Sequence, residues 1–222
     1  MKFYHVIIAL LICIQVACSA KSNRNSDTSE LHETPNISYD SFLHSLENTK
    51  NDIDSGDYSK TAQLLYTVIN NDIPLYWTGT KWDFNGTTKK PKVGTIACGY
   101  FLTTVMDQTG YEIKRVWMAQ QASSVLIKSY CSDVKITGSL KGLKAYLKEQ
   151  PDSSCFILGL DFHTGFVTKN GDTFSFIHSN YIDGEGVIKE SIDISEALAT
   201  NEFFMIGSLT KNKERISEWM GW

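Results

Sequence analysis

The chain of 222 residues is 42% hydrophobic and 21% charged, with a formal net charge of −4. This composition is typical of one well-buried globular domain, and the length leaves little room for a second. The sequence contains no basic stripe interleaved with aromatic residues, so nucleic acid is not expected as a partner.

The first 18 residues predict a signal peptide. A lysine precedes the apolar core VIIALLICIQVA, and small residues follow it, which is the layout of a secretory leader. The apolar run is short for a bilayer span, so a transmembrane anchor is the weaker interpretation. The segment Val16-Ala17-Cys18-Ser19 resembles the lipobox of bacterial lipoproteins. It implies an exported protein that is anchored in the cell envelope by a lipid on Cys18; the alternative is a periplasmic or secreted protein cleaved near Ala20.

A polar segment without a core-forming pattern follows, from residue 19 to 37. It is interpreted as a tether before a single domain, residues 38–222. At the start of that domain, apolar residues recur at helical spacing from Tyr39 to Lys50 and again from Ser59 to Asn70. These two stretches predict a pair of helices that packs on the rest of the domain.

Residues 73–95, IPLYWTGTKWDFNGTTKKPKVGT, combine three glycines with four aromatic residues. The glycines predict a loop, whereas the aromatic residues indicate that this loop makes contacts and is not simply solvated. Two interpretations stay open. The aromatic residues line a binding groove, or they pin a long loop to the core.

The stretch VGTIACGYFLTTVM, from Val93 to Met106, predicts a glycine-punctuated approach and then a buried helix that begins at Cys98. The run is too apolar for a surface helix, and Gly110 stands where a C-cap is expected. A thiol in the first turn faces unpaired N–H groups and the positive end of the helix dipole, which favour the thiolate. Cys98 is therefore a candidate nucleophile; the alternative is a small core residue.

Beyond this helix, the sequence predicts a short strand at 112–116, a helix at 117–129 and a helix at 140–150 that Ser139 caps. The hydrophobic period then changes to that of strands. The predicted strands are 155–162, 163–171, 172–181, 186–193 and 203–209, with a helix at 194–200 and a short amphipathic turn at the end. Helices first and a largely antiparallel sheet afterwards predict an α+β fold.

Two histidines belong to one predicted hairpin. Asn170-Gly171 is the hairpin signal between the strands that carry His163 and His178. Folding about that turn pairs residues whose numbers sum to roughly 341, so the two imidazoles are expected opposite one another. With Cys98 delivered by a helix on this sheet, the three residues form a thiol, a base and a partner that orients the base. His163 would take the thiol proton, and His178 would fix its tautomer.

Zinc binding is the rival use of these residues. A closed zinc site takes four ligands and a catalytic one three, and the sequence has no short-spaced Cys/His motif. We expect no metal and no other cofactor. Three cysteines remain after the leader, an odd number, which leaves one thiol free. If Cys131 and Cys155 form a disulfide, the free one is Cys98, but the spacing leaves that pairing open.

Several motifs follow one another in an order that is typical of a known protein family. They are a cysteine at a helix start, then Phe162-His163-Thr164-Gly165-Phe166-Val167, Phe176-Ile177-His178-Ser179 and Gly186-Val187-Ile188, with Tyr76-Trp77-Thr78-Gly79 before the cysteine. From about residue 74 to 190 the chain thus resembles the NlpC-type cell-wall cysteine peptidases, which have a papain-like fold. The resemblance implies Cys98 as nucleophile, His163 as base, His178 as the orienting third residue and Tyr76 near the oxyanion or substrate.

The chain departs from this family at the nucleophile. The family's usual Asp-Cys-Ser-Gly is here Ala97-Cys98-Gly99-Tyr100, so the acidic and hydroxyl groups that help to bind the substrate amine are missing. The residues expected to carry the reaction are retained, but the identity of the substrate is left open. We expect the substrate contacts to come from Tyr76, Trp77, Trp82 and Gly99.

The hypothesis from the sequence is an exported cysteine peptidase or amidase. It would hydrolyse amide bonds, in peptidoglycan stem peptides or a related small peptide, through a thioester acyl-enzyme. One alternative is a non-catalytic module of the same fold that holds a glycan or peptide on the aromatic loop. Another is a cysteine acyltransferase, which passes the acyl group to an amine.

Overall fold

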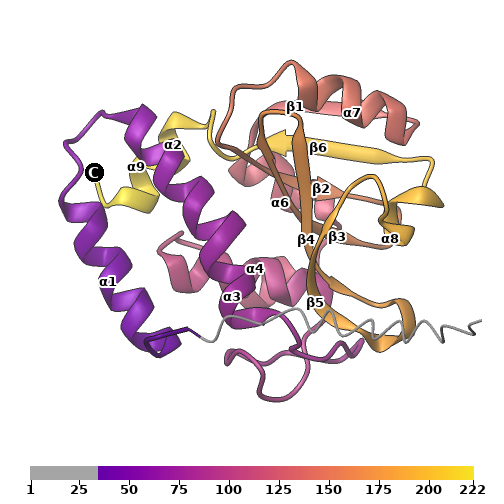
Figure 1. The fold of residues 1–222 in the computed structure, drawn as a ribbon, viewed down its shortest axis with the longest axis horizontal. Coiled ribbons are helices and arrows are strands. Elements are labelled where there is room, and N and C mark those ends of the chain that lie inside the picture. The colour runs from indigo at the N-terminus through magenta and orange to yellow at the C-terminus, as the bar shows by residue number, and fades with distance from the viewer. Residues whose placement is uncertain (1–34) are drawn as a thin grey trace, which may run out of the picture. The chain divides into compact units, whose positions relative to one another are not determined.

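A computed structural model describes residues 35–222 of the chain (Figure 1). The expected signal peptide, the expected lipidation site Cys18 and most of the expected tether lie outside the described residues. Among the helices that are described, none combines the length and the apolar character that crossing a membrane requires.

The centre of the fold is one six-stranded, fully antiparallel sheet in the order β1-β6-β2-β3-β4-β5. Its strands are β1 (Ser132–Thr137), β2 (Ser154–Gly159), β3 (Thr164–Asn170), β4 (Thr173–Asn180), β5 (Gly186–Ser191) and β6 (Phe204–Ser208). Four of the five strands predicted from the alternating pattern are consecutive hairpin partners, and the fifth, β6, inserts between β1 and β2. The predicted α+β class is confirmed.

Helices cover both faces of the sheet (Figure 1). Those of the first half are α1 (Tyr39–Asn51), α2 (Tyr58–Thr67), the π-helix η1 (Val68–Asp72), α3 (Ile73–Trp77), α4 (Cys98–Thr109), α5 (Arg115–Ala119) and α6 (Ser123–Tyr130). Those of the second half are α7 (Leu140–Lys148), the short η2 (Ile182–Gly184), α8 (Glu196–Ala199) and α9 (Lys213–Met220). The helix predicted to begin at Cys98 is confirmed, and Gly110 ends it in a left-handed conformation with φ of 109°.

Two hydrophobic cores lie on opposite faces of the sheet, because successive residues of a buried strand point to opposite sides. Ile157 of β2 joins the core that contains Phe101 and Val105 of α4. Its neighbours Phe156 and Leu158 join the other core, with side chains from α7 and α8. Strands β2, β3, β4 and β6 are therefore buried on both faces, and a group on these strands can meet solvent only near their ends.

Three predictions of local structure are wrong. Residues 112–116 form no strand; α5 begins at Arg115, whose buried guanidinium is held by Thr104 and by the Thr87 carbonyl. The helix expected at 117–129 is split into α5 and α6. The expected loop at 73–95 begins as helix α3, because the apolar side chains there are buried. Strand β1 was not predicted, since its only strand partner is β6, far along the chain.

The hairpin between β3 and β4 has a register different from the predicted one. Val167 pairs with Phe176 and Asn170 with Thr173, so His178 lies opposite Gly165 and not opposite His163. A Cβ atom at Gly165 would lie 2.8 Å from the Cβ of His178 and 2.4 Å from the Phe176 ring. Glycine is required here because the His178 ring stacks on Phe176, with 4.1 Å between centroids. His163 precedes β3 and reaches His178 diagonally.

The cysteines of the domain are unpaired in the described structure. Cys98, Cys131 and Cys155 are all free thiols. The disulfide considered between Cys131 and Cys155 is therefore not formed, and both of these side chains are buried in the core of the α4 face.

Candidate active site

Cys98 is the first residue of α4, and its sulfur meets the start of β3. Ala97 precedes it with extended backbone, and no side chain caps the helix. The backbone N–H groups of Cys98 and Gly99 point at the sulfur, as does the N–H of Thr164 from the strand. The free N–H groups of a helix N-terminus thus face the reactive atom, as the sequence predicted.

The charge state of Cys98 differs from the prediction. Burial raises the pKa of its thiol, and the hydrogen bonds from Gly99, Thr164 and its own N–H offset that effect only in part. The expected helix-stabilised thiolate is wrong for the resting protein, because desolvation of the sulfur outweighs the helix terminus. Cys98 is a thiol at neutral pH, and it needs a base to become a nucleophile.

The two histidines form the first part of a buried hydrogen-bonded chain. His163 Nε2 lies 2.7 Å from His178 Nδ1, and His178 Nε2 lies 3.0 Å from Glu190 Oε1 of β5. His163 is 5% exposed and His178 is fully buried. His178 lies on the sheet face of Phe176, away from α4, whereas His163 sits at the end of the sheet, where it can reach towards Cys98.

The direction of the protons in this chain follows from Glu190. A carboxylate only accepts hydrogen bonds, so His178 Nε2 carries a proton and donates it to Glu190. His178 Nδ1 then accepts from His163 Nε2–H. His163 Nδ1 is left with a lone pair, and this buried atom has no hydrogen-bond partner in the described part of the chain. The arrangement presents one free basic nitrogen at the site.

Burial keeps both imidazoles neutral. Desolvation, together with the proximity of His178, lowers the pKa of His163 to about 3. Desolvation also lowers the pKa of His178, opposed by its hydrogen bond to Glu190. Burial of Glu190 favours its protonated form, but the hydrogen bond from His178 reverses this, and the pKa of Glu190 is lowered. The resting chain is therefore a carboxylate followed by two neutral imidazoles.

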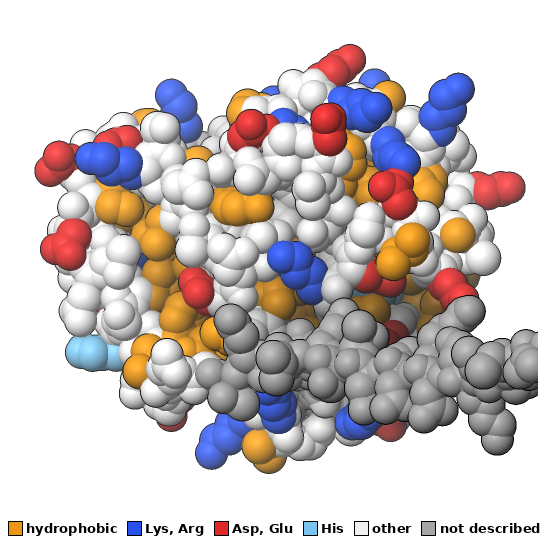
Figure 2. All heavy atoms as spheres, in the orientation of Figure 1, with side chains coloured by type: hydrophobic (Ala, Val, Ile, Leu, Met, Phe, Trp, Pro, Cys, Tyr) orange, Lys and Arg blue, Asp and Glu red, His pale blue; other side chains and the backbone are white. Residues whose placement is uncertain are grey.

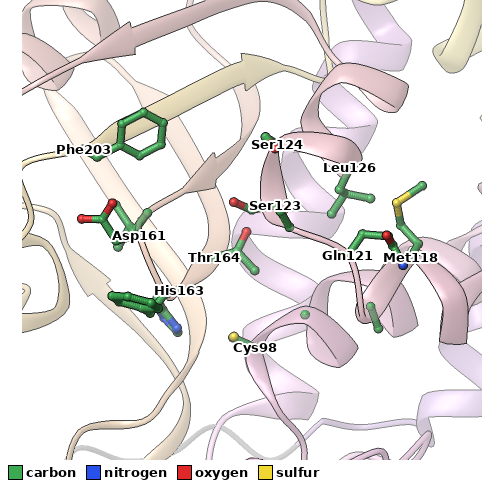
Figure 3. A pocket seen from close by; sticks show the side chains of 15 residues that line it. Cys98, Met118, Gln121, Ser123, Ser124, Leu126, Asp161, His163, Thr164 and Phe203 are labelled. Carbon is green, nitrogen blue, oxygen red and sulfur yellow. The ribbon is translucent and has the colours of Figure 1, made fainter.

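Cys98 and His163 lie where two cavities meet. Figure 3 shows the Cys98 sulfur and a His163 ring nitrogen turned towards each other at the edge of one cavity. This smaller cavity, of about 410 Å³, is lined mainly by α5, α6 and the turn before β3, including Ser123, Leu126 and Phe203. The second cavity, of about 750 Å³, opens on the other side and also includes Cys98, Gly99, Phe162 and His163. A substrate can thus extend in two directions from the sulfur.

Two of the expected substrate contacts lie elsewhere. Tyr76 packs against the rings of Tyr39 and Phe42, and Trp77 is fully buried against Phe101. Neither residue lines the cavities beside Cys98. The placement of Tyr76 and Trp77 at the substrate is therefore corrected: they belong to helix α3 and to the core, because one side of the segment is apolar at helical spacing.

The other two expected contacts are at the site. Trp82 lines the larger cavity and stands 6.5 Å from the ring of Tyr181, centroid to centroid. Gly99 lines both cavities. A Cβ atom at Gly99 would lie 2.6 Å from the Ala119 carbonyl oxygen, so a glycine is needed where α5 approaches α4.

Reasoning from the sequence missed several residues of the site. Glu190 was not identified, although it occupies a strand position on the same face as His178 once the β4–β5 register is known. Tyr181, which packs edge-on against His163 with centroids 5.1 Å apart, and the exposed Phe162 were also missed. Phe162 directly precedes a predicted base, and an apolar residue that exposes 97% of its surface there is a signal for binding.

The loop that carries Trp82 is held in place by contacts with the rest of the domain. Arg115 donates to the carbonyls of Thr87 and Thr88, and Ser179 Oγ donates to the Ile96 carbonyl at 2.7 Å. Short bridges join Lys81 to Thr95 and Thr87 to Ile96. The wall of the larger cavity is therefore pre-formed, although part of it is loop.

Within residues 35–222, no group of three or more His, Cys, Asp or Glu side chains is arranged to hold a metal ion. Acidic and basic side chains are intermixed over the face that Figure 2 shows, beside apolar areas. No protein-family model, curated protein or solved structure matches this chain. The resemblance to NlpC-type peptidases accordingly rests on the sequence motifs.

Proposed function

We propose that the protein is a cysteine peptidase or amidase that hydrolyses amide bonds of a peptide substrate, with peptidoglycan stem peptides as the class that the sequence motifs favour. One observation carries the proposal. A buried hydrogen-bonded chain runs from Glu190 through His178 to His163, and a ring nitrogen of His163 is turned towards the Cys98 sulfur (Figure 3). Any buried imidazole requires hydrogen-bond partners such as those of His178, but His163 keeps one ring nitrogen without a partner among residues 35–222, and a base needs such a nitrogen.

In the proposed reaction, His163 Nδ1 takes the Cys98 proton while the sulfur attacks the carbonyl carbon of the amide. The carbonyl becomes an oxyanion, and the free N–H groups at the N-terminus of α4 stabilise it. The positive charge that His163 gains is stabilised by Glu190 through His178.

The tetrahedral intermediate then collapses. The carbon–nitrogen bond breaks, His163 returns its proton to the leaving amine, and a thioester with Cys98 is left. Water attacks the thioester with His163 as base, which releases the acid and restores the thiol. Because the resting pair is neutral, the proton moves during the attack itself and not beforehand.

Alkylation of Cys98 by iodoacetamide tests this activation. The labelled residue is identified by peptide mass spectrometry, and the second-order rate at pH 7 is compared between the wild type and His163→Gln. We expect a loss of at least about tenfold in the variant, since a positioned base typically contributes more than this. Gln121→Ala, a change at the rim of the smaller cavity, is the control. Equal rates in the wild type and His163→Gln would contradict the proposal.

Hydrolysis and acyl transfer share every step up to the thioester. The cavities on both sides of Cys98 leave space for an amine acceptor as well as for water. Product analysis of a cleaved peptide, with and without an added amine, distinguishes the two reactions. A transferase yields the new amide, whereas the proposed hydrolase yields the free acid.

A further inference from the structure

The larger cavity beside Cys98 has an unusual wall. Its aromatic side chains come from four separate stretches of the chain: Trp82, Phe84, Tyr100, Phe162 and Tyr181. Among residues 35–222, no Lys, Arg, Asp or Glu side chain lines it. A charged group that entered this cavity would lose water and find no opposite charge, whereas an apolar group would lose nothing.

Two of these rings lie open to solvent. Phe84 is 79% exposed and Phe162 is 97% exposed. Isolated exposed apolar residues are common, but here they face one cavity that includes the reactive sulfur. Covering them with a ligand would remove apolar surface from water, which is the main source of binding free energy at such sites.

Part of the wall is held in place by contacts within the domain. The loop that carries Trp82 and Phe84 is held by Arg115 and Ser179, and Tyr181 packs on His163. A pre-formed wall spares the cost of ordering a loop on binding. Tyr181 also brings the wall into contact with the proposed base, since its ring lies 5.1 Å from that of His163.

We infer that this aromatic cavity is a specificity subsite that takes an uncharged apolar or aromatic side chain next to the amide bond being cleaved. The inference rests on the proposed function and narrows its substrate class. A substrate residue bound here carries no charge, so the acidic or basic residues of a peptide must lie elsewhere along the cleft.

Paired alkylating reagents test the subsite without a known substrate. Cys98 is alkylated with iodoacetamide, N-benzyl-iodoacetamide and iodoacetate. The rate for each reagent is divided by the rate at which the same reagent alkylates glutathione. We expect the benzyl reagent to be favoured over iodoacetamide by about tenfold, because burial of part of a phenyl ring supplies that factor. Iodoacetate is expected to be disfavoured.

The doubly substituted variant Trp82→Ala/Phe84→Ala should lose most of this preference, measured as the ratio of its rates with the benzyl reagent and with iodoacetamide. Trp117→Ala is the matched control, since Trp117 is 53% exposed and lines neither cavity beside Cys98. It should leave the preference unchanged. Circular dichroism of each variant checks that the fold is intact.

The outcomes separate the two proposals. If wild-type Cys98 prefers the benzyl reagent to iodoacetamide no more than glutathione does, the subsite is overturned, whatever the role of His163. A greater preference for N-iodoacetyl-glucosamine than for the benzyl reagent also overturns it, in favour of a sugar site. A benzyl preference that survives in His163→Gln with an unchanged rate supports the subsite but contradicts the proposed function. A Cys98 that no reagent alkylates overturns both.

Discussion

Cysteine thiols occur both at the N-terminus of α4 and in the centre of the core, and their surroundings differ. Cys98 lies partly open at a helix N-terminus, whereas Cys131 and Cys155 are buried, and burial raises the pKa of all three. Burial therefore does not distinguish the candidate nucleophile. What distinguishes it is access from two cavities, N–H groups aimed at the sulfur and a neighbouring imidazole with a free nitrogen.

A helix N-terminus is often taken to imply a thiolate, but the effect is modest and desolvation can exceed it. With its pKa raised by burial, the Cys98 thiol would need a base to react, and His163, which is hydrogen-bonded through His178 to Glu190, lines the same cavities. Changing any one of these differences between the two regions should have a measurable effect.

The largest expected effect is on native-state labelling. In the folded protein, iodoacetamide should alkylate Cys98 about 10³-fold or more faster than Cys131 or Cys155, because the buried pair reacts only after the core opens. Quantitative mass spectrometry of the labelled peptides over time measures the ratio. After unfolding in guanidinium chloride the three rates should converge. Comparable rates in the native state would mean that Cys98 is as sealed as the other two.

The buried imidazoles should make the fold sensitive to acid. The pKa of His163 is about 3 in the folded protein and near its usual value in the unfolded chain. Between these values the unfolded chain binds more protons, so stability falls as pH decreases from about 6.5 towards 3, by up to about 1.4 kcal/mol per pH unit for this histidine. Urea unfolding at several pH values measures the slope.

Variants test the origin of that acid sensitivity. His163→Gln should flatten the slope, since glutamine does not titrate. Cys98→Ser keeps both imidazoles and should retain it. An unchanged slope in His163→Gln would assign the acid sensitivity to other groups.

Replacing single cysteines should change the free energy of unfolding more in the core than at the N-terminus of α4. Cys155 is fully buried in β2, so Cys155→Ser puts a hydroxyl among apolar side chains and should cost about 1–3 kcal/mol. Cys98→Ser, at the rim of the cavities, should change the free energy of unfolding by less than about 0.5 kcal/mol. Equilibrium unfolding in urea compares the two variants, and equal losses would contradict the assignment of Cys98 to an open site.

The smallest effect is expected at the far end of the chain of hydrogen bonds. Glu190→Gln can donate to His178 as well as accept from it, so it weakens control of the histidine tautomers. The His163-dependent alkylation of Cys98 should fall by about tenfold, the worth of one charge-assisted hydrogen bond. Glu196→Gln is the control, because Glu196 lies near Glu190 but has no bond to His178. Equal effects of both variants would exclude a positioning role for Glu190.

Much of the fold could be predicted from local pattern. The start of α4 at Cys98, its end at Gly110 and the hairpin at Asn170-Gly171 all follow from residues close together in the sequence. Helix α7 also begins as expected, with Ser139 Oγ accepting from the Gly142 N–H at 3.1 Å. Caps, turns and periodicity are short-range effects, so one segment is enough to indicate them.

The site was only partly predictable. Cys98, His163 and His178 could be named because a nucleophile, a base and a hairpin are each visible in the sequence. Strand β1 and Glu190 could not be found in this way, because each depends on a partner that only the sheet order or register supplies. Tyr76 and Trp77 were misplaced for a related reason: aromatic residues look alike whether they face a cavity or a core.

The sequence by itself indicated most of the elements, the α+β class and the three candidate residues Cys98, His163 and His178, because hydrophobic period and turn chemistry are local properties. The tertiary structure alone decided the two-residue difference in hairpin register, the diagonal contact between the imidazoles and the neutral state of Cys98 and His163. Those features depend on how much water each group loses, and that loss is set by segments far apart in the chain.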